Sequence, residues 1–208
     1  MTQASVLPQA PVGFDLDLTL IDSRRAILES FAGLAADTGV AIDPAAVTSR
    51  LGIKLEAELA YWFPPGEIAE AVRRYRAHYL RLSGPLTTRL PGAAEALEAV
   101  WAAGARVVVV TAKHEVTARL ALQGVGLSAD ELYAEAHGPE KGLILKAIGA
   151  AVYVGDTPAD MLAAATAGAH AVGVSTGSFT AADLRAAGAA DVLSSLTDFP
   201  PLYRKLTT

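Results

Sequence analysis

Short apolar runs alternate with longer helical patterns along most of this chain, and this alternation is the feature that most constrains its fold. Several runs are rich in valine and carry few charges, which is typical of strands buried on both faces of a parallel sheet. The first run is punctuated by acids, so we predict a buried strand that ends in a functional loop. The runs cover residues 12–20, 105–111, 151–155, 170–175 and 191–193.

Helical patterns fill the intervals between these runs, and several of them end at a glycine, the residue expected just past a helix C-terminus. Strands that alternate with helices of this length indicate βαβ units, and the right-handed crossover rule leaves few topologies for them. We therefore predict an α/β fold with a Rossmann-like, doubly wound parallel sheet. The predicted helices cover residues 93–103, 115–123, 141–148, 158–167 and 181–187.

One long interval departs from this alternation, because residues 23 to about 89 show helical patterns and no convincing strand. Asp43-Pro44 is typical of an N-cap followed by proline at the first helical position. Ser83-Gly84-Pro85 is predicted to close the last helix of the interval. The predicted helices cover residues 23–37, 44–51, 55–62 and 67–82.

This interval divides the chain into two predicted domains. Residues 1–22 and 87–208 are expected to form the α/β core, and residues 23–86 an all-helical cap. Because the insertion follows the first strand, the cap is expected to rise from the C-terminal edge of the sheet.

Composition and charge narrow the class of protein. Apolar residues make up 52% of the chain and charged residues 19%, which excludes intrinsic disorder. The net charge of −5 provides no general attraction to nucleic acid or to an anionic membrane, so we expect neither as a partner. The chain has no cysteine, which excludes disulfides, thiolate metal sites and a cysteine nucleophile.

The N-terminal residues lack the basic and apolar regions of a signal peptide. The longest stretch without charged side chains, residues 161–182, is broken by glycines, a histidine and hydroxyls, which makes it a poor membrane span. We therefore expect a cytoplasmic protein, either a monomer or a homodimer.

Acids, a hydroxyl and a lysine gather where the predicted strands end, which is where open α/β sheets bind ligands. Clustered carboxylates repel one another unless a cation neutralises them, and a site of oxygen ligands alone suits Mg²⁺. A carboxylate that faces a phosphate can act as a nucleophile, while a lysine and a hydroxyl can hold the phosphoryl oxygens. The residues are Asp15, Asp17, Thr111, Lys141, Asp156 and Asp160.

In order and spacing these residues resemble the four motifs of the haloacid dehalogenase-like (HAD) hydrolase superfamily. The motifs read Asp15-x-Asp17-x-Thr19, a strand-end Thr111, Lys141, and Gly155-Asp156-x-x-x-Asp160. Arg89-Leu-Pro-Gly92, followed by a helix and a strand that ends in Thr-Ala-Lys, is similar to the phosphoglycolate phosphatase branch. The resemblance runs from about residue 12 to about residue 198 and implies a phosphatase with a helical cap.

The resemblance also implies roles for the four acids. Asp15 would attack the substrate phosphorus and form an aspartyl-phosphate. Asp17 would protonate the leaving alcohol and then activate the water, while its backbone carbonyl reaches Mg²⁺. Asp156 would complete the metal site, with Asp160 as a supporting or water-mediated acid.

Thr111 and Lys141 would bind the phosphoryl oxygens, and Ala112 belongs to the same segment. Ala112 replaces a frequent asparagine, so we expect one side-chain contact fewer there. At position 18, leucine stands where these phosphatases usually have glycine, and we expect its backbone to serve the phosphate only with a negative φ. Gly142 follows Lys141 where proline is commoner, and the short interval to Asp156 implies a trimmed helix.

Purely structural explanations exist for several of these residues. An EF-hand calcium loop starting at Asp15 is excluded, because Leu20 and Ala26 occupy the positions that need Gly and Glu. Asp156 and Asp160 could do no more than cap the following helix.

Lys146 is an alternative to Lys141 as the phosphate-binding lysine, and we prefer Lys141 because it lies at the start of the helix. The four histidines, which show no ligand spacing, are predicted to be structural or on the surface: His78, His114, His137 and His170.

A glycine turn between two predicted cap helices, Arg50-Leu-Gly52-Ile-Lys54, provides candidate substrate contacts. If Lys54 or Arg50 faces the site, the substrate should carry an anion besides its phosphate, as phosphoglycolate does. Alternatively, Lys54 pairs with Glu58 at i,i+4 on the helix surface.

The predicted activity is Mg²⁺-dependent hydrolysis of a small phosphorylated metabolite, of the phosphoglycolate kind. Asp17 argues against the dehalogenases and phosphonate-cleaving members of the superfamily, which lack an acid there. A sugar-phosphate mutase keeps the same acids and stays open as an alternative. A catalytically silent binding protein is the alternative from a different class.

Overall fold

A six-stranded parallel sheet lies at the centre of the computed structural model, which describes residues 10–208. The strand order is β5-β4-β1-β6-β7-β8, so the chain leaves β1 first towards one edge of the sheet and later towards the other. This reversal beside β1 is the topological switch point at which such sheets bind ligands. The strands are β1 (Val12–Phe14), β4 (Val107–Val110), β5 (Glu131–Tyr133), β6 (Val152–Gly155), β7 (His170–Val174) and β8 (Asp191–Leu193).

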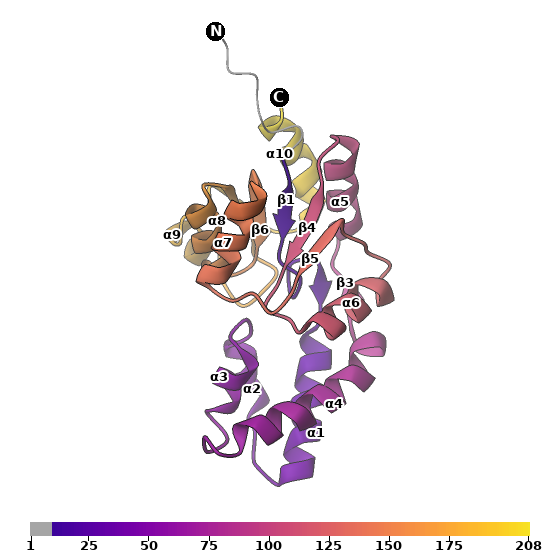
Figure 1. Cartoon of the computed structure of the whole chain (residues 1–208), viewed down its shortest axis with the longest axis vertical. Coiled ribbons are helices and arrows are strands. Elements are labelled where there is room, and N and C mark those ends of the chain that lie inside the picture. The colour runs from indigo at the N-terminus through magenta and orange to yellow at the C-terminus, as the bar shows by residue number, and fades with distance from the viewer. Residues whose placement is uncertain (1–9) are drawn as a thin grey trace.

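Helices cover both faces of this sheet (Figure 1). Both faces need this cover because both are apolar. The four valines of β4 are all buried, and successive valines belong to different hydrophobic cores on the two sides of the sheet. Val107 and Val109 pack with α5, α6 and α10, whereas Val108 and Val110 pack with α7, α8 and α9. The helices are α5 (Ala93–Ala102), α6 (Glu115–Gly124), α7 (Pro139–Ile148), α8 (Pro158–Ala167), α9 (Ala181–Ala186) and α10 (Phe199–Leu206). The doubly wound parallel sheet predicted from the sequence is confirmed.

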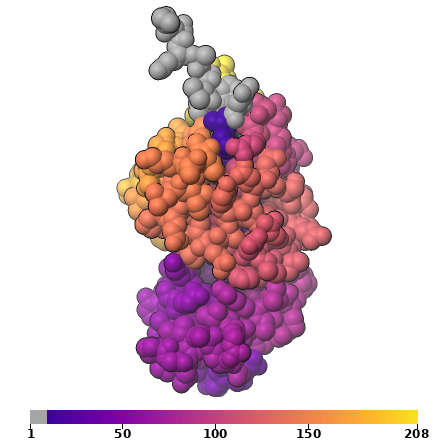
Figure 2. All heavy atoms as spheres, in the orientation of Figure 1, coloured from indigo at the N-terminus to yellow at the C-terminus, as the bar shows by residue number. Residues whose placement is uncertain are grey.

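Four further helices lie beyond the C-terminal ends of the strands and share a hydrophobic core of their own (Figures 1 and 2). Phe31 on the first of them stacks near Tyr75 on the last, with ring centroids 4.7 Å apart. These helices, called the cap below, are α1 (Arg24–Thr38), α2 (Pro44–Ser49), α3 (Leu55–Leu59) and α4 (Ile68–Leu86). A two-residue antiparallel pair, β2 (Ile21–Asp22) with β3 (Thr88–Arg89), joins the cap to the sheet.

Some local predictions are wrong. Ser83-Gly84-Pro85 does not close the last cap helix, because α4 runs on to Leu86 with Pro85 inside it. Pro85 therefore lies in the last turn of the helix, where it supplies no N–H to the helical hydrogen bonds. Strands β3 and β5, the helical turn at Leu196–Asp198 and helix α10 were not predicted.

None of the helices in the described residues is long and apolar enough to cross a membrane. The prediction that the N-terminal segment is not a signal peptide concerns residues that lie mostly outside the described range.

Candidate active site

Asp15 is the first residue after β1, and the residue is only 6% exposed. Its backbone N–H donates to the carbonyl of Val154, which extends the pairing with β6 by one residue. The chain then turns tightly, because the carbonyl of Leu16 accepts from the N–H groups of Leu20 and Ile21. This turn returns the chain towards the cap and leaves Asp15 and Asp17 at the edge of the sheet.

Leu18 occupies the tip of that turn with φ = +61°, so the condition of a negative φ, under which its backbone was expected to serve the phosphate, is not met. Two hydrogen bonds hold the conformation: the Leu18 N–H donates to the Ile21 carbonyl, and the Thr176 hydroxyl donates to the Leu18 carbonyl. Leucine therefore adopts the left-handed backbone that glycine would adopt without strain.

Lys141 connects two of the predicted acids. Its ammonium donates to Asp15 Oδ1 at 2.9 Å and to Asp160 Oδ1 at 2.7 Å. Burial alone would lower the pKa of Lys141, but the charges of Asp15 and Asp160 raise the pKa well above its ordinary value. Lys141 is therefore a fixed cation in the first turn of α7. Its competitor Lys146 is exposed and lies away from these acids.

The glycine after Lys141 has a packing reason. A Cβ at Gly142 would lie 2.7 Å from Cβ of Thr166 on α8. The close approach of α7 to α8 therefore excludes a side chain at this position, which accounts for one departure from the superfamily pattern.

Asp160 uses both of its oxygens within the protein and is fully buried. Oδ1 accepts from Lys141 and from the Tyr153 hydroxyl, and Oδ2 accepts from the N–H and hydroxyl of Thr157. With Thr157 it forms a capping box at the start of α8. Asp160 therefore caps this helix and also holds Lys141 in place.

Asp156 lies beside Asp15 at the end of β6. Its Oδ1 accepts from the Thr19 hydroxyl at 3.2 Å. A Cβ at Gly177 would lie 1.9 Å from Oδ2, so only glycine lets the loop after β7 approach this carboxylate. Burial and the neighbouring charge of Asp15 raise the pKa of Asp156 well above its ordinary value.

The carboxylates of Asp15, Asp156 and Asp160 each offer an oxygen within 4.8 Å of the others. Burial, opposed in part by Lys141, raises the pKa of Asp15 to about 7. Asp15 Oδ2 and Asp156 Oδ2 accept no hydrogen bond from residues 10–208. Three acids facing one ammonium, with two uncommitted oxygens, form a donor set that fits a hard divalent cation such as Mg²⁺.

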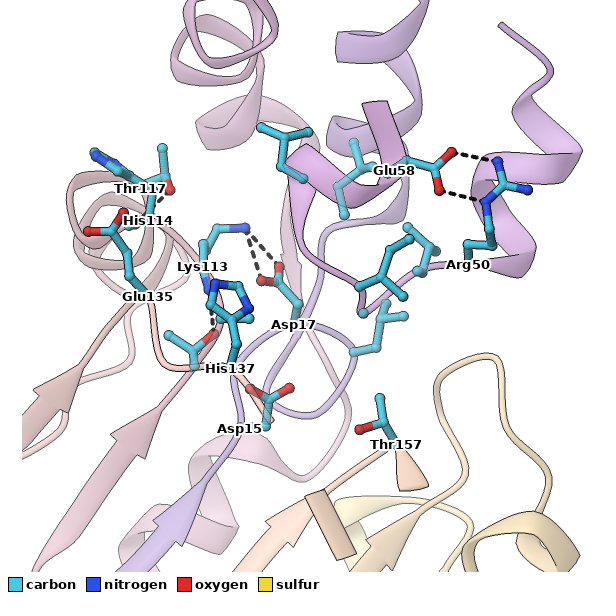
Figure 3. A pocket seen from close by; sticks show the side chains of 18 of the residues that line it. Asp15, Asp17, Arg50, Glu58, Lys113, His114, Thr117, Glu135, His137 and Thr157 are labelled. Carbon is cyan, nitrogen blue, oxygen red and sulfur yellow. Dashed lines mark hydrogen bonds and ion pairs between the residues drawn. The ribbon is translucent and has the colours of Figure 1, made fainter. Parts of the chain in front are cut away.

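Asp17 lies apart from this cluster, with its side chain turned towards the cap (Figure 3). Lys113 Nζ donates to both of its oxygens, at 2.8 and 3.2 Å, and Ser23 donates to one of them. The same ammonium also contacts the hydroxyl of Tyr79 on α4, at 2.6 Å. Burial alone would lower the pKa of Lys113, but the charges of Asp17 and Tyr79 and the hydrogen bonds to both together outweigh it and raise the pKa.

Sequence reasoning did not identify Lys113 as a site residue. The available signal was its place in Thr111-Ala112-Lys113, at the same strand end as Thr111. The Thr111 hydroxyl accepts from the Lys113 N–H at 3.1 Å and is buried, and Ala112 lines the same cavity.

A cavity of about 250 Å³ separates these residues from the cap. Asp15, Asp17, Lys141 and Asp156 line its sheet side. Its cap side is lined mainly by apolar and aromatic side chains, namely Ile27, Phe31, Val47, Leu51, Ile53, Leu55, Tyr75 and Tyr79. His114 and His137, which were predicted to be structural or on the surface, also line the cavity.

The two cap cations differ from what the sequence predicted. Arg50 lines the cavity, but its guanidinium donates to both oxygens of Glu58, each at 2.7 Å (Figure 3). The predicted pairing of Lys54 with Glu58 is wrong, because Glu58 binds Arg50 and the indole of Trp62. Lys54 is exposed, makes no ion pair with residues 10–208 and does not line the cavity.

Comparisons with known proteins agree with this geometry. Residues 12–174 match the model of the haloacid dehalogenase-like hydrolase family. A protein of Dickeya dadantii named probable phosphatase IndB is 30% identical over 91% of this chain and 97% of its own length. A phosphoglycolate phosphatase of Rhodospirillum rubrum is 31% identical over 82% of this chain and 81% of its own.

A solved structure shows the same fold over nearly the whole chain. The haloacid dehalogenase-like hydrolase from Streptococcus pneumoniae superposes with a TM-score of 0.82 at 22% identity, covering 94% of this chain and 99% of its own.

Proposed function

The chain belongs to the haloacid dehalogenase-like hydrolase family and is an enzyme of its phosphatase type, and from this premise we propose that it hydrolyses a small phosphate monoester through an aspartyl-phosphate on Asp15. The observation that carries the proposal is the pairing of Asp15 with Lys141 at the switch point of the sheet, with Asp156 beside it and Asp17 two residues on.

In the first step, one oxygen of Asp15 forms a bond to the substrate phosphorus while the bond from phosphorus to the ester oxygen breaks. The departing alkoxide takes a proton from Asp17 and leaves as the alcohol. In the second step, water attacks the phosphorus and gives its proton to Asp17. The acyl-phosphate bond then breaks, which releases phosphate and restores both carboxyl groups.

The surrounding residues supply charge and position for these steps. Lys141 and Thr111 would hold the phosphoryl oxygens, where charge is spread in the transition state. Asp15, Asp156 and the backbone carbonyl of Asp17 would hold Mg²⁺, which supplies positive charge for a phosphate that approaches Asp15. Asp160, whose oxygens are all engaged, supports the site by fixing Lys141.

The leaving group is the finer part of the proposal. The relative from Rhodospirillum rubrum favours phosphoglycolate as one substrate to test. The ion pair of Arg50 with Glu58 favours other esters, because the charge of the guanidinium is already neutralised by Glu58. The same pair counts against a sugar-phosphate mutase, which must bind a second phosphate. The complete set of acids counts against a catalytically silent protein.

Phosphate release from a panel of small phosphate esters, measured with Mg²⁺ and again with EDTA, tests this proposal. We expect release with Mg²⁺ and loss of release with EDTA. No release from any ester, or full activity in EDTA, would contradict it, and an isomerised product that keeps its phosphate would favour the mutase.

A further inference from the structure

Among the described residues that line the cavity, the cap side offers an ester's leaving group no unpaired cation. We propose that the enzyme selects phosphate monoesters of uncharged alcohols with an apolar body, and that Glu58 enforces this selection by neutralising Arg50. The inference rests on the proposed phosphatase activity and names the substrate class of that same site.

The pair of Arg50 and Glu58 is built to stay closed. Two parallel hydrogen bonds of 2.7 Å join the guanidinium to the carboxylate, which is the strongest geometry for such a pair. Glu58 is only 4% exposed and also accepts from Trp62, while Arg50 lies over the ring of Tyr61, 4.2 Å from its centroid. A carboxylate on the substrate would have to displace Glu58 to take this bidentate position, or bind the remaining N–H groups of a guanidinium that Glu58 already neutralises.

The other charges on the same wall do not compensate. Arg76 lies 3.8 Å from Glu56 and 3.9 Å from Glu135, and all three line the cavity. With the pair of Arg50 and Glu58, the cap side carries two cations and two carboxylates, and Glu135, from the segment after β5, adds a third carboxylate. A second anion on the substrate would therefore meet no net positive charge on the cap side to offset the loss of its hydration.

The remaining wall suits an apolar leaving group. Phe31, Val47 and Leu51 line it, and Tyr75 provides a further aromatic face. Tyr75 is 8% exposed, and its hydroxyl has no hydrogen-bond partner among residues 10–208. Burial raises its pKa well above the ordinary value, so it stays a neutral donor for an uncharged oxygen of the substrate.

Two matched ester pairs separate charge from size. The first is phosphoglycolate with its amide, carbamoylmethyl phosphate, and the second is 4-carboxybenzyl phosphate with 4-carbamoylbenzyl phosphate. In each pair a carboxylate and a carboxamide of similar shape occupy the same position. For the wild-type enzyme with Mg²⁺ we expect kcat/KM to favour the amide by about tenfold or more in each pair.

Glu58→Gln should shift this preference, because the amide cannot neutralise the guanidinium of Arg50. We expect the ratio of amide to carboxylate to fall by about tenfold. The double variant R50Q/E58Q removes both charges together and should keep the wild-type preference. Glu70→Gln breaks an exposed pair with Arg74 on α4, away from the cavity, and serves as the control with an unchanged ratio.

The outcomes distinguish the two levels of the proposal. No phosphate release from any of the four esters would overturn the phosphatase function and the selectivity with it. Release that is equal or faster from the carboxylates would overturn the selectivity alone. An unchanged ratio in a folded Glu58→Gln would overturn the role of Glu58. If that variant does not fold, a loss of the preference in R50Q/E58Q would overturn the same role.

Discussion

At the scale of single residues, the site depends on an excess of carboxylates over cations. Asp15, Asp156 and Asp160 are buried together, and Lys141 is the one ammonium that contacts two of them among the described residues. The raised pKa values of Asp15 and Asp156 follow first from their burial and then from this imbalance of charge. Without a metal ion, one of these carboxyl groups keeps a proton near neutral pH.

This imbalance predicts that Mg²⁺ and protons compete. Between pH 3.8 and about 7 the folded protein binds more protons at Asp15 than the unfolded chain does, so the metal-free protein loses stability as the pH rises through that interval. Mg²⁺ should displace those protons, and it should therefore raise Tm more at about pH 8 than at about pH 5. Thermal unfolding with Mg²⁺ and with EDTA at both values measures this. A larger shift at the lower pH would contradict it.

Leu18 allows a test of the strained turn. Leu18→Gly should relieve roughly 1 kcal/mol of left-handed strain but lose about 2–3 kcal/mol of apolar burial. Leu16, also buried but without a positive φ, is the matched control, and Leu16→Gly should lose its burial with no such relief. Urea unfolding should therefore find Leu16→Gly more destabilising by about 1–2 kcal/mol. Equal losses would mean that Leu18 carries no strain.

At the scale of elements, Lys113 links the strand end of β4 to helix α4 of the cap. Its ammonium contacts Asp17 on one side and the hydroxyl of Tyr79 on the other. The side chain that we assign to proton transfer is thus held by a core residue that also touches the cap.

Lys113→Met removes the contact that orients Asp17, so we expect proton transfer to the leaving group to weaken through lost positioning. Because kcat/KM reports the steps through phosphoryl transfer, we expect it to fall by about 10–100-fold for alkyl phosphates, whose leaving groups need the proton. Aryl phosphates, which leave more easily, should lose less. Tyr79→Phe keeps the aromatic ring beside the ammonium and should show a smaller loss with both. Equal losses for alkyl and aryl esters would assign Lys113 to another role.

The sequence predicted the elements whose signal is local. The valines of β4 are buried on both sides, so their pattern is continuous and unambiguous. The edge strand β5 is three partly exposed residues with no such pattern, and β2 and β3 are two residues each, so pairing alone defines them. The prediction that the helix ends before Pro85 is wrong, because this helix accommodates a proline in its last turn.

The same distinction applies to the candidate site. Motif residues such as Asp15 and Asp156 could be predicted because each follows a recognisable strand. The ion-pair partners of these residues could not be predicted. Lys113 contacts Asp17, which lies 96 positions away in the sequence, and Glu58 pairs with Arg50 and not with the predicted Lys54. Such choices depend on the packing of the cap, which no local pattern records.

At the scale of the whole molecule, the sheet and the cap line opposite sides of the cavity and have different proposed functions. The cap packs against one end of the sheet domain (Figure 2). The sheet places the acids and Lys141 at its switch point, and the cap lines the other side of the cavity with apolar and paired side chains. The proposed chemistry therefore belongs to the sheet and the proposed selectivity to the cap. Both depend on Asp15 being the group that accepts the phosphoryl group.

The most direct test is to trap that intermediate. The enzyme is mixed with Mg²⁺ and a hydrolysable ester, quenched rapidly in acid and mapped by mass spectrometry of its peptides. We expect one phosphoryl group on Asp15 in the wild-type enzyme and none in Asp15→Asn, which should also lose turnover. A phosphoryl group on another residue, or sustained turnover by Asp15→Asn, would contradict the account.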